Sequence, residues 1–441
     1  MASLAHIRNA IPPEGLFAGK EWLVSPQPFP LSKRDAEELG KLGYRLALFN
    51  KAANLLYAQS LKGKQPAWIA DYLDRGKSPE LLDLARSQPL RHTLPRVIRP
   101  DIILTETGWT LSELDTVPGG IGLTGWLNQT YASAGHPVLG GPDGMIEGFR
   151  SLLPDGGEIL VSEESATYRP EMQWLAGQLN QSTPNPSDGT PESLPRWTVG
   201  HAEAPTPNAP AYYRFFELFD LPNLPGLDLP RIATRLTPPP KPFLEEKLWF
   251  ALFWMRPLRE WWRRELSERH FLKLQEVIPY TWIIDPAPLP HFATLPGLDL
   301  QNWDELKTLS QKQREFVCKI SGFSELAWGS RGVHVAQDLP QNDWAAVVDD
   351  AIASFPHHPY ILQRFHKGKQ ITHPFFDRDT GEEKLLRGRV RLCPYYFIGS
   401  DEHATLSGAL ATIVPADKKI LHGMTDAILC PAEILPDLPK L

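Results

Sequence analysis

Apolar residues recur at helical spacing through the first part of the chain, from about Leu31 to Leu84, with charged residues between them. The stretch AEELGKLGYRLALFNKAANLLYAQ shows this pattern most clearly. Apolar residues three and four positions apart form one stripe on a helix, and the charged residues then lie on the opposite face. The pattern predicts an N-terminal helical layer over residues 1–94.

The pattern changes to strand-like runs between residues 97 and 114. VIRPDIIL and WTLSEL are joined by TETG, whose glycine and small polar residues suit a hairpin turn. Because successive side chains on a strand point to opposite faces, Arg99 and Asp101 share one face of the first run. Glu113 and Asp115 likewise share one face of the second. If the runs pair, three carboxylates and a guanidinium group converge on one patch.

The second half of the chain combines helical and strand-like segments. Residues 243–274 are helical in pattern, rich in Trp and Phe, and interrupted by Pro257. Strand-like runs follow as VIPYTWII, QREFVCKI, VHVAQ, PYILQRF, RGRVRLCPYYFI and LSGALATIV. This mixture predicts an α+β fold with a largely antiparallel sheet.

Proline and small polar residues mark the boundaries between parts of the chain. They are concentrated in residues 180–210 and 221–242, which indicates surface excursions or linkers. The chain is therefore divided into the helical layer, a hairpin part (95–150), a substrate-side region with proline-rich linkers (151–240) and a second lobe (241–441). The total of 44 prolines indicates many loops and argues against long uninterrupted helices.

Composition narrows the range of partners. A net charge of −7 provides no field that would attract nucleic acid or an anionic membrane. The longest apolar run, LWFALFWM, has eight residues, against the ~20 of a membrane-spanning helix. Three cysteines without a CxxC pair argue against a disulfide framework or a zinc site, and the N-terminus lacks the apolar run of a secretion signal. We expect a cytoplasmic protein without nucleic-acid or membrane partners.

Three segments carry residues suited to phosphate chemistry. Carboxylates such as those of the predicted hairpin bind Mg²⁺ together with substrate phosphates. Lys319 leads into SGFSELAWGSRG, whose glycines would let backbone amides approach phosphate oxygens, although the Walker sequence GxxxxGK[ST] is absent. Lys247 opens the aromatic helical region. Taken singly, these features also fit a salt-bridged surface hairpin, an ordinary loop and a lysine that covers apolar surface.

The order of the three segments resembles that of circularly permuted ATP-grasp ligases related to the synthetase domain of glutathionylspermidine synthetase. RPD, a gap of eleven residues and ExD resemble the RxD…ExN element that holds the magnesium ions of that family. LEEKLWFALFW is similar to its asparagine-lysine helix, and VCKISGFSELAWGSRGVHV to its strand lysine and phosphate-covering loop. YILQRF lies where its adenine-contacting hinge is found. The carboxylates precede the lysines, which is the permuted order.

The resemblance implies antiparallel sheets flanked by helices, and binding of ATP and Mg²⁺. It implies metal ligation by Asp101, Glu113 and Asp115, a phosphate and transition-state contact at Arg99, and nucleotide contacts at Lys247, Lys319, Ser330, Arg331, Gly332, Gln363, Arg364 and Phe365. The chain departs from the family at Asp115, where the family has asparagine, and at Ile320, where proline often follows the lysine. The amidase half of the bifunctional relative has no counterpart, so amide hydrolysis is not expected.

The implied reaction joins a small-molecule or peptide carboxylate to an amine through an acyl phosphate, with closure of the 321–332 loop excluding water. The alternatives are a nucleotide-binding sensor or scaffold without turnover, a kinase that stops at the phosphorylated product, and a proline-rich interaction protein suggested by TPPPKP. No general base is assigned, because lone histidines on strands are more often structural; this applies to His334, His366, His373 and His422. Specificity is expected in the N-terminal layer and in residues 155–240.

Overall fold

The structure is a computed structural model that describes residues 3–10, 21–181, 196–327, 329, 331–421 and 425–435. Its helices are α1 (Leu4–Ala10), α2 (Lys33–Leu61), α3 (Trp68–Asp74), α4 (Pro79–Arg86), α5 (Ile121–Ser133), α6 (Gly144–Leu152), α7 (Arg169–Gln181), α8 (Leu229–Ile232), α9 (Leu248–Trp254), α10 (Arg259–Leu266), α11 (Glu268–Val277) and α12 (Gln341–Ser354). Its strands are β1 (Phe29–Leu31), β2 (Val97–Thr105), β3 (Gly108–Asp115), β4 (Gly157–Val161), β5 (Trp197–His201), β6 (Tyr212–Phe215), β7 (Leu236–Thr237), β8 (Thr281–Ile283), β9 (Phe316–Ile320), β10 (Val333–Val335), β11 (Tyr360–Arg364), β12 (Gln370–Phe376), β13 (Glu383–Ile398), β14 (Ala404–Pro415) and β15 (Ile428–Ile434).

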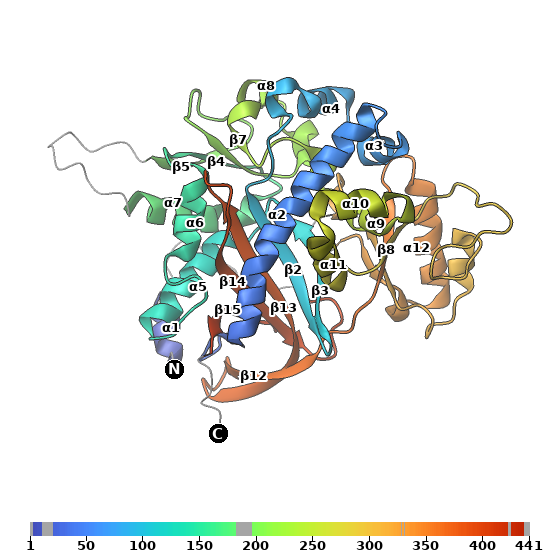
Figure 1. Ribbon diagram of the computed structural model, residues 1–441. Coiled ribbons are helices and arrows are strands. Elements are labelled where there is room, and N and C mark those ends of the chain that lie inside the picture. Colours follow the sequence, from blue (N-terminus) through green and yellow to red (C-terminus); the bar gives the residue numbers. More distant parts are fainter. Residues whose placement is uncertain are drawn as a thin grey trace.

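The largest sheet has the strand order β1-β15-β14-β13-β2-β3, and β12 also pairs with β13. Figure 1 shows α2 crossing this sheet on one side, with α5 and α6 on the other. Strand alternation explains the two covered faces, because Leu392 joins the core cluster that contains Leu46 of α2. Its neighbour Cys393 joins the cluster that contains Phe149 of α6. The sheet is therefore buried on both faces and is a rigid base for side chains at its β3 edge.

The longest helix corrects an expectation drawn from the proline count. α2 runs uninterrupted for 29 residues, because the prolines lie outside the stretch 31–65. The side chain of Ser32 accepts a hydrogen bond from the amide of Asp35 and so caps the helix. At Gly43 an added Cβ would lie 2.3 Å from the ring of Tyr396, so the helix backbone lies directly on the sheet.

A four-stranded antiparallel sheet with the order β10-β9-β11-β8 confirms four of the strands predicted in the second lobe, whereas β13 and β14, also expected in that lobe, belong to the largest sheet. Cys318 and Leu362 pack with Trp344 of α12 on one face. Lys319 pairs with Ile361 and Val317 with Gln363 in the strand register. Alternation therefore places the side chains of Lys319 and Gln363 together on the opposite face.

The region 151–240 differs from the prediction of linkers. It contains a parallel sheet with the order β5-β4-β6-β7, which the sequence pattern did not reveal. The part expected to be a surface excursion, 221–242, is largely internal from Ile232 onward, and Lys241 is fully buried. Proline has no N–H group that needs a partner, so Pro238, Pro239 and Pro240 can be buried without an unsatisfied donor.

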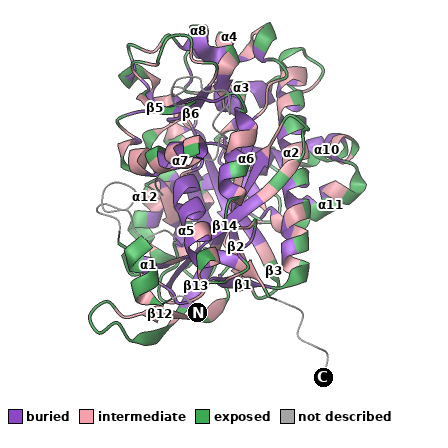
Figure 2. Cartoon of the chain, turned by 90° about the vertical axis from the view of Figure 1, so that its left-hand side faces the viewer, coloured by how far each residue is buried: buried purple, intermediate pink, exposed green. Residues whose placement is uncertain are grey.

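The buried residues of the chain lie mainly on the three sheets and on the helices packed against them. Figure 2 shows buried residues concentrated on the strands and on the helix faces that cover them. Within the described part of the chain, no helix is both long and apolar enough to cross a bilayer.

Candidate active site

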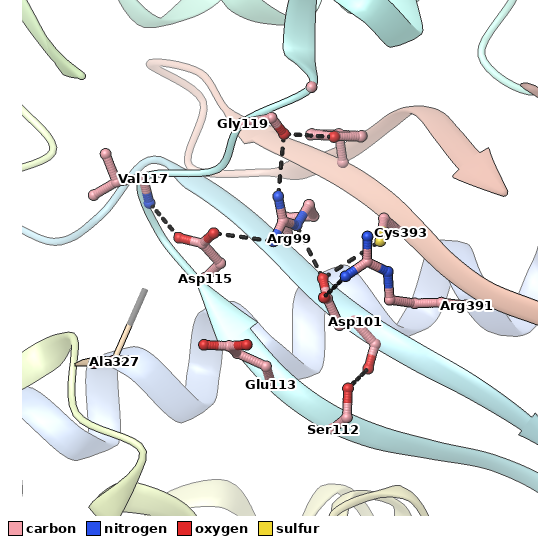
Figure 3. A network of polar contacts seen from close by, with 12 residues as sticks. Arg99, Asp101, Ser112, Glu113, Asp115, Val117, Gly119, Ala327, Arg391 and Cys393 are labelled. Carbon is pink, nitrogen blue, oxygen red and sulfur yellow. Dashed lines mark hydrogen bonds and ion pairs between the residues drawn. The ribbon is translucent and has the colours of Figure 1, made fainter. Parts of the chain in front are cut away.

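The β2–β3 hairpin carries the carboxylates and the arginine singled out from the sequence. Arg99 pairs with Asp115 and Asp101 with Glu113 in the strand register, so the predicted hairpin is confirmed. Arg99 Nε donates to Asp101 Oδ1 at 3.0 Å, and its Nη2 lies 3.0 Å from Asp115 Oδ2. Its Nη1 donates to the carbonyl of Gly119 at 3.1 Å. Figure 3 shows this guanidinium group between the two carboxylates.

Asp101 lies between two arginines. Its side chain is 5% exposed, and Arg391 Nη1 of β13 lies 3.0 Å from its Oδ2 (Figure 3). Burial alone would raise the pKa of Asp101, but Arg99 and Arg391 outweigh it and lower that pKa. Sequence reasoning missed Arg391. The signal was available in RGRVRLC, where arginines at alternate positions share one face of a strand.

The other two carboxylates of the hairpin are more accessible. The side chains of Glu113 and Asp115 are 37% and 27% exposed. Burial raises the pKa of Asp115, and the neighbouring Glu113 adds to this effect while Arg99 opposes it. Among the residues that the structure describes, no group of three or more His, Cys, Asp or Glu side chains is arranged to hold a metal ion. The metal role of Asp101, Glu113 and Asp115 stays a prediction.

Both predicted nucleotide lysines reach β3 from the second lobe. Lys247, just before α9, forms a 2.7 Å ion pair with Glu113 and donates to the carbonyl of Ala327 at 3.3 Å. Lys319 donates to the carbonyl of Ser112 at 2.7 Å and to Gln363 Oε1 at 3.0 Å. Burial lowers the pKa of Lys319 to about 8. A negative charge placed near this lysine, such as that of a phosphate group, would favour its charged form and raise its pKa.

These residues surround two adjoining cavities. The larger has a volume of about 420 Å³, and its walls include Arg99, Asp115, Lys247, Gly322 and Arg331. The smaller has a volume of about 120 Å³ and is lined by Lys319 and by the predicted hinge, Gln363, Arg364 and Phe365. Asp101, Glu113, Val333 and Arg391 line both cavities. Segments far apart in the sequence thus converge on one continuous site.

Gly332 is held within its own loop, and other residues named from the sequence lie outside the described residues. Gly332 packs within its own loop, where its amide donates to the carbonyl of Leu326 at 2.7 Å and an added Cβ would lie 2.7 Å from the same oxygen. Its backbone is therefore held by loop packing. Ser330 and His422 lie outside the described residues.

Three of the four histidines considered from the sequence lie in the described part of the chain, and burial lowers the pKa of each. His373 is buried beside Ser25, whose Oγ lies 3.0 Å from its Nε2, and burial lowers its pKa to about 4. It is therefore a neutral core residue. His366 lines the smaller cavity, and burial also lowers its pKa. His334, on β10, pairs with Cys318 in the register, and burial again lowers its pKa.

Sequence reasoning missed two glutamates on the far wall of the larger cavity. Glu217 follows β6, and Glu245 forms an ion pair with the fully buried Arg214. Burial, together with the nearby Glu245, raises the pKa of Glu217 to about 8. Burial likewise raises the pKa of Glu245 to about 7, against the opposing effect of Arg214. These carboxyl groups exchange protons near neutral pH, unlike Asp101.

Comparison with solved structures finds the same fold in a glutathione synthetase-like effector from Globodera pallida in its apo form. The alignment covers 98% of this chain and 97% of that chain, with a TM-score of 0.56 and 12% identity. A putative gamma-glutamylcysteine synthetase from Methylobacillus flagellatus KT aligns over 81% of this chain and 85% of that chain, with a TM-score of 0.39 and 14% identity. No protein-family model and no curated protein sequence matches the chain. The effector from Globodera pallida therefore shares the fold of this chain.

Proposed function

We propose that the protein is a Mg²⁺- and ATP-dependent ligase that joins a carboxylate to an amine through an acyl phosphate. The observation that carries the proposal is the convergence of Arg99, Lys247 and Lys319 with the hairpin carboxylates around two adjoining cavities. The fold shared with a glutathione synthetase-like protein supports the same conclusion. The carboxylates precede the lysines along the chain, which supports a circularly permuted ATP-grasp arrangement like that of glutathionylspermidine synthetase.

The residues of the site fit a nucleotide phosphate group. Within the described part of the chain, the buried Nε of Arg391 has no hydrogen-bond partner, although its side chain lines both cavities. A buried guanidinium N–H gains most from a charged acceptor, and a phosphate oxygen is such an acceptor. Lys319 and Gln363 in the smaller cavity would contact the nucleotide, and Lys247 in the larger one would contact its phosphates.

The carboxylates fit magnesium by the chemistry of their donor atoms. Hard divalent cations take carboxylate oxygens together with phosphate oxygens. Glu113 and Asp115 are the accessible pair, while Arg99 and Arg391 hold Asp101 in place beside them. Bound Mg²⁺ would neutralise charge on the phosphates.

The other steps fall to the chain's own groups. Arg99 would direct its planar fork at the phosphoryl group as negative charge develops there, which favours the transition state over the ground state. The loop from 321 to 332 would exclude water from the acyl phosphate. A pKa of about 8 leaves a fraction of Glu217, on the wall of the larger cavity, deprotonated at neutral pH, and this form would accept the proton that the ammonium form of the acceptor must lose before its nitrogen attacks the acyl carbon. Phosphate then leaves as the amide bond forms.

Substrate-dependent ADP release tests the proposal. Purified protein is supplied with Mg·ATP and a panel of carboxylates, with and without hydroxylamine as a general amine acceptor. The ligase reaction predicts ADP and a hydroxamate only when both a carboxylate and hydroxylamine are present. ADP formed with a carboxylate alone and independent of hydroxylamine would identify a kinase. Mg·ATP binding without ADP across the panel would identify a sensor or scaffold and overturn the proposal.

A further inference from the structure

A buried ion pair between Lys77 and Glu246 lies next to the segments that carry Lys247 and Lys319. Lys77, which follows α3, lies 2.5 Å from Glu246 Oε1, and the two side chains are 1% and 2% exposed. The second carboxylate oxygen of Glu246 accepts a hydrogen bond from the hydroxyl of Ser321. Every charge and hydroxyl in this group is therefore partnered, as buried polar groups require.

Ser321 connects this ion pair to the start of α9. Its carbonyl accepts the amide hydrogen of Lys247 at 3.0 Å, and its hydroxyl oxygen accepts that of Leu248 at 2.9 Å. The first amides of a helix have no partner within the helix, so Ser321 caps α9 from another segment. The hydroxyl can do this because it donates its own hydrogen to Glu246.

The phosphate-covering loop also begins at this ion pair. At Gly322 an added Cβ would lie 3.0 Å from the carboxylate of Glu246 and 3.1 Å from the carbonyl of Glu245. Lys319 lies on β9, and Ser321 follows directly after the end of that strand. The amide of Ser321 donates to the carbonyl of Pro359 at 2.9 Å, which anchors the end of β9.

Lys77 brings the N-terminal helical layer into this arrangement. Its ammonium group lies 5.2 Å from the ring centroid of Phe323 and donates to the carbonyl of Arg75 at 3.3 Å. An added Cβ at Gly76 would lie 2.4 Å from the carbonyl of His357, so this turn is packed tightly against the second lobe. The helical layer therefore supplies the counter-ion of Glu246.

We infer that Glu246, paired with Lys77, is a positioning residue that sets Lys247, Lys319 and the first glycine of the loop relative to one another. The inference rests on the proposed nucleotide function of those two lysines. Glu246 itself is absent from the walls of both cavities described above. Its effect on a ligand is exerted through Ser321, whose hydroxyl and carbonyl hold the first turn of α9.

The mechanism follows from the hydrogen-bond capacity of the groups. A carboxylate accepts from both Lys77 and Ser321, whereas the amide of a Glu246→Gln side chain has one oxygen and one NH₂ group. Either Lys77 or Ser321 then faces the NH₂ group of the glutamine, which is a donor and cannot accept a hydrogen bond. If it is Ser321, its hydroxyl must turn or move. A displacement near 1 Å at a site that depends on geometry can reduce its function by on the order of a hundredfold.

The experiment compares Glu246→Gln with Glu158→Gln in the full chain. Glu158 is also a buried glutamate, and it accepts hydrogen bonds from the amide and hydroxyl of Thr206, away from the cavities. Thermal unfolding gives the loss of stability in each variant. Isothermal titration with Mg·ATP, well below both unfolding midpoints, gives the nucleotide affinity. The inference predicts a roughly ten- to hundredfold weaker affinity in Glu246→Gln and less than about a twofold change in Glu158→Gln.

The outcomes separate the two proposals. Failure of the unmodified protein to bind Mg·ATP would overturn the nucleotide function itself. Normal binding by the unmodified protein with equal affinities in both variants would overturn the positioning role alone. Hydrogen exchange is a second readout that does not depend on nucleotide. The Leu248 amide should exchange faster in Glu246→Gln than in Glu158→Gln, and equal exchange would also count against the inference.

Discussion

The two walls of the larger cavity use the same residue types to opposite electrostatic effect. On the hairpin wall, Asp101 is held by Arg99 and Arg391, which lower its pKa against the effect of burial. On the far wall, Glu217 and Glu245 lie close to a single buried arginine, and burial raises the pKa of both. Two guanidinium groups outweigh the effect of burial at Asp101, whereas Arg214 does not outweigh it at Glu217 and Glu245.

This difference assigns separate tasks to the walls. On the hairpin wall, Arg99, Arg391 and the charged Asp101 hold one another in a fixed geometry, which suits the binding of metal and phosphate groups. The far wall presents acids that gain or lose a proton near neutral pH, which suits a step in which an amine is deprotonated. The variants of Arg99, Glu217 and Asp115 below each alter one wall of the larger cavity, and the Lys319 variant alters the smaller cavity.

The largest effect is expected at Arg99. Arg99→Ala should reduce substrate-dependent ADP release on the order of a hundred- to a thousandfold while weakening Mg·ATP binding far less, because the fork acts on charge that develops during transfer. Arg99→Lys keeps the charge without the fork and should recover part of the rate. Steady-state kinetics and calorimetric titration measure the two quantities separately.

Arg96 provides the matched control for this variant. It is also a partly buried arginine, but it donates to the carbonyls of Ile398, Leu152 and Ser151. Arg96→Ala should lower the unfolding temperature without a selective loss of turnover. Near-normal ADP release in Arg99→Ala would remove Arg99 from the mechanism and leave a structural ion pair in its place.

The second effect concerns nucleotide affinity. Lys319→Ala should weaken Mg·ATP binding roughly tenfold or more, because a charge-assisted contact from a buried site is lost. Arg263→Ala on α10 is the control, since that arginine forms its ion pairs with Glu260 and Glu268 on the exposed surface. Equal losses of affinity in the two titrations would contradict the assignment of Lys319.

The third effect is a pH dependence of stability. A glutamate has a pKa near 4.3 in an unfolded chain, and burial raises that of Glu217 to about 8 in the folded protein. The folded state then binds the proton more tightly, so this residue's contribution to stability is lost as pH rises through that interval. Glu217→Gln should show a shallower decline of unfolding temperature between about pH 5 and pH 8. Parallel declines in the two proteins would refute the raised pKa.

The smallest effect is expected at Asp115. Asp115→Asn keeps an oxygen ligand but removes one negative charge and weakens the contact with Arg99. Since Arg99 retains Asp101 and the carbonyl of Gly119, Mg·ATP affinity should change by no more than roughly threefold, or ~0.6 kcal/mol. A much larger loss, measured by the same titration, would mean that the charge of Asp115 is essential to metal binding.

The hairpin wall was predictable from the sequence because its geometry is local. Alternation along two short runs joined by a turn is enough to bring Arg99, Asp101 and Glu113 together, and the structure has that register. The antiparallel second lobe was predictable for a similar reason, because its strands are marked by clear apolar runs. The metal and nucleotide roles of these residues remain predictions.

The far wall was not predictable because its geometry depends on contacts between residues that lie far apart in the sequence. β6 and β7 contain only four and two residues, and the strands of their sheet are separated by long connections. Such short runs carry little periodic signal. Glu217 and Glu245 come into one cavity only when this parallel sheet packs beside the segment before α9. The alternation in RGRVRLC marks the face of the strand on which Arg391 lies, but its place beside Asp101 follows only from the pairing of β13 with β2.

The pairing of β1 with β15 has a consequence for synthesis of the protein. Phe29 pairs with Ala432, almost at the opposite end of the chain. At a translation rate of about 5–20 residues per second, β1 emerges from the ribosome on the order of 20 to 80 s before its partner strand exists. During that interval the apolar face of α2 also lacks β14, to which it packs in the finished sheet. Folding of the central sheet can therefore be completed only after β15 has been synthesised, and chaperones that shield the nascent N-terminal segment should raise the yield of folded protein.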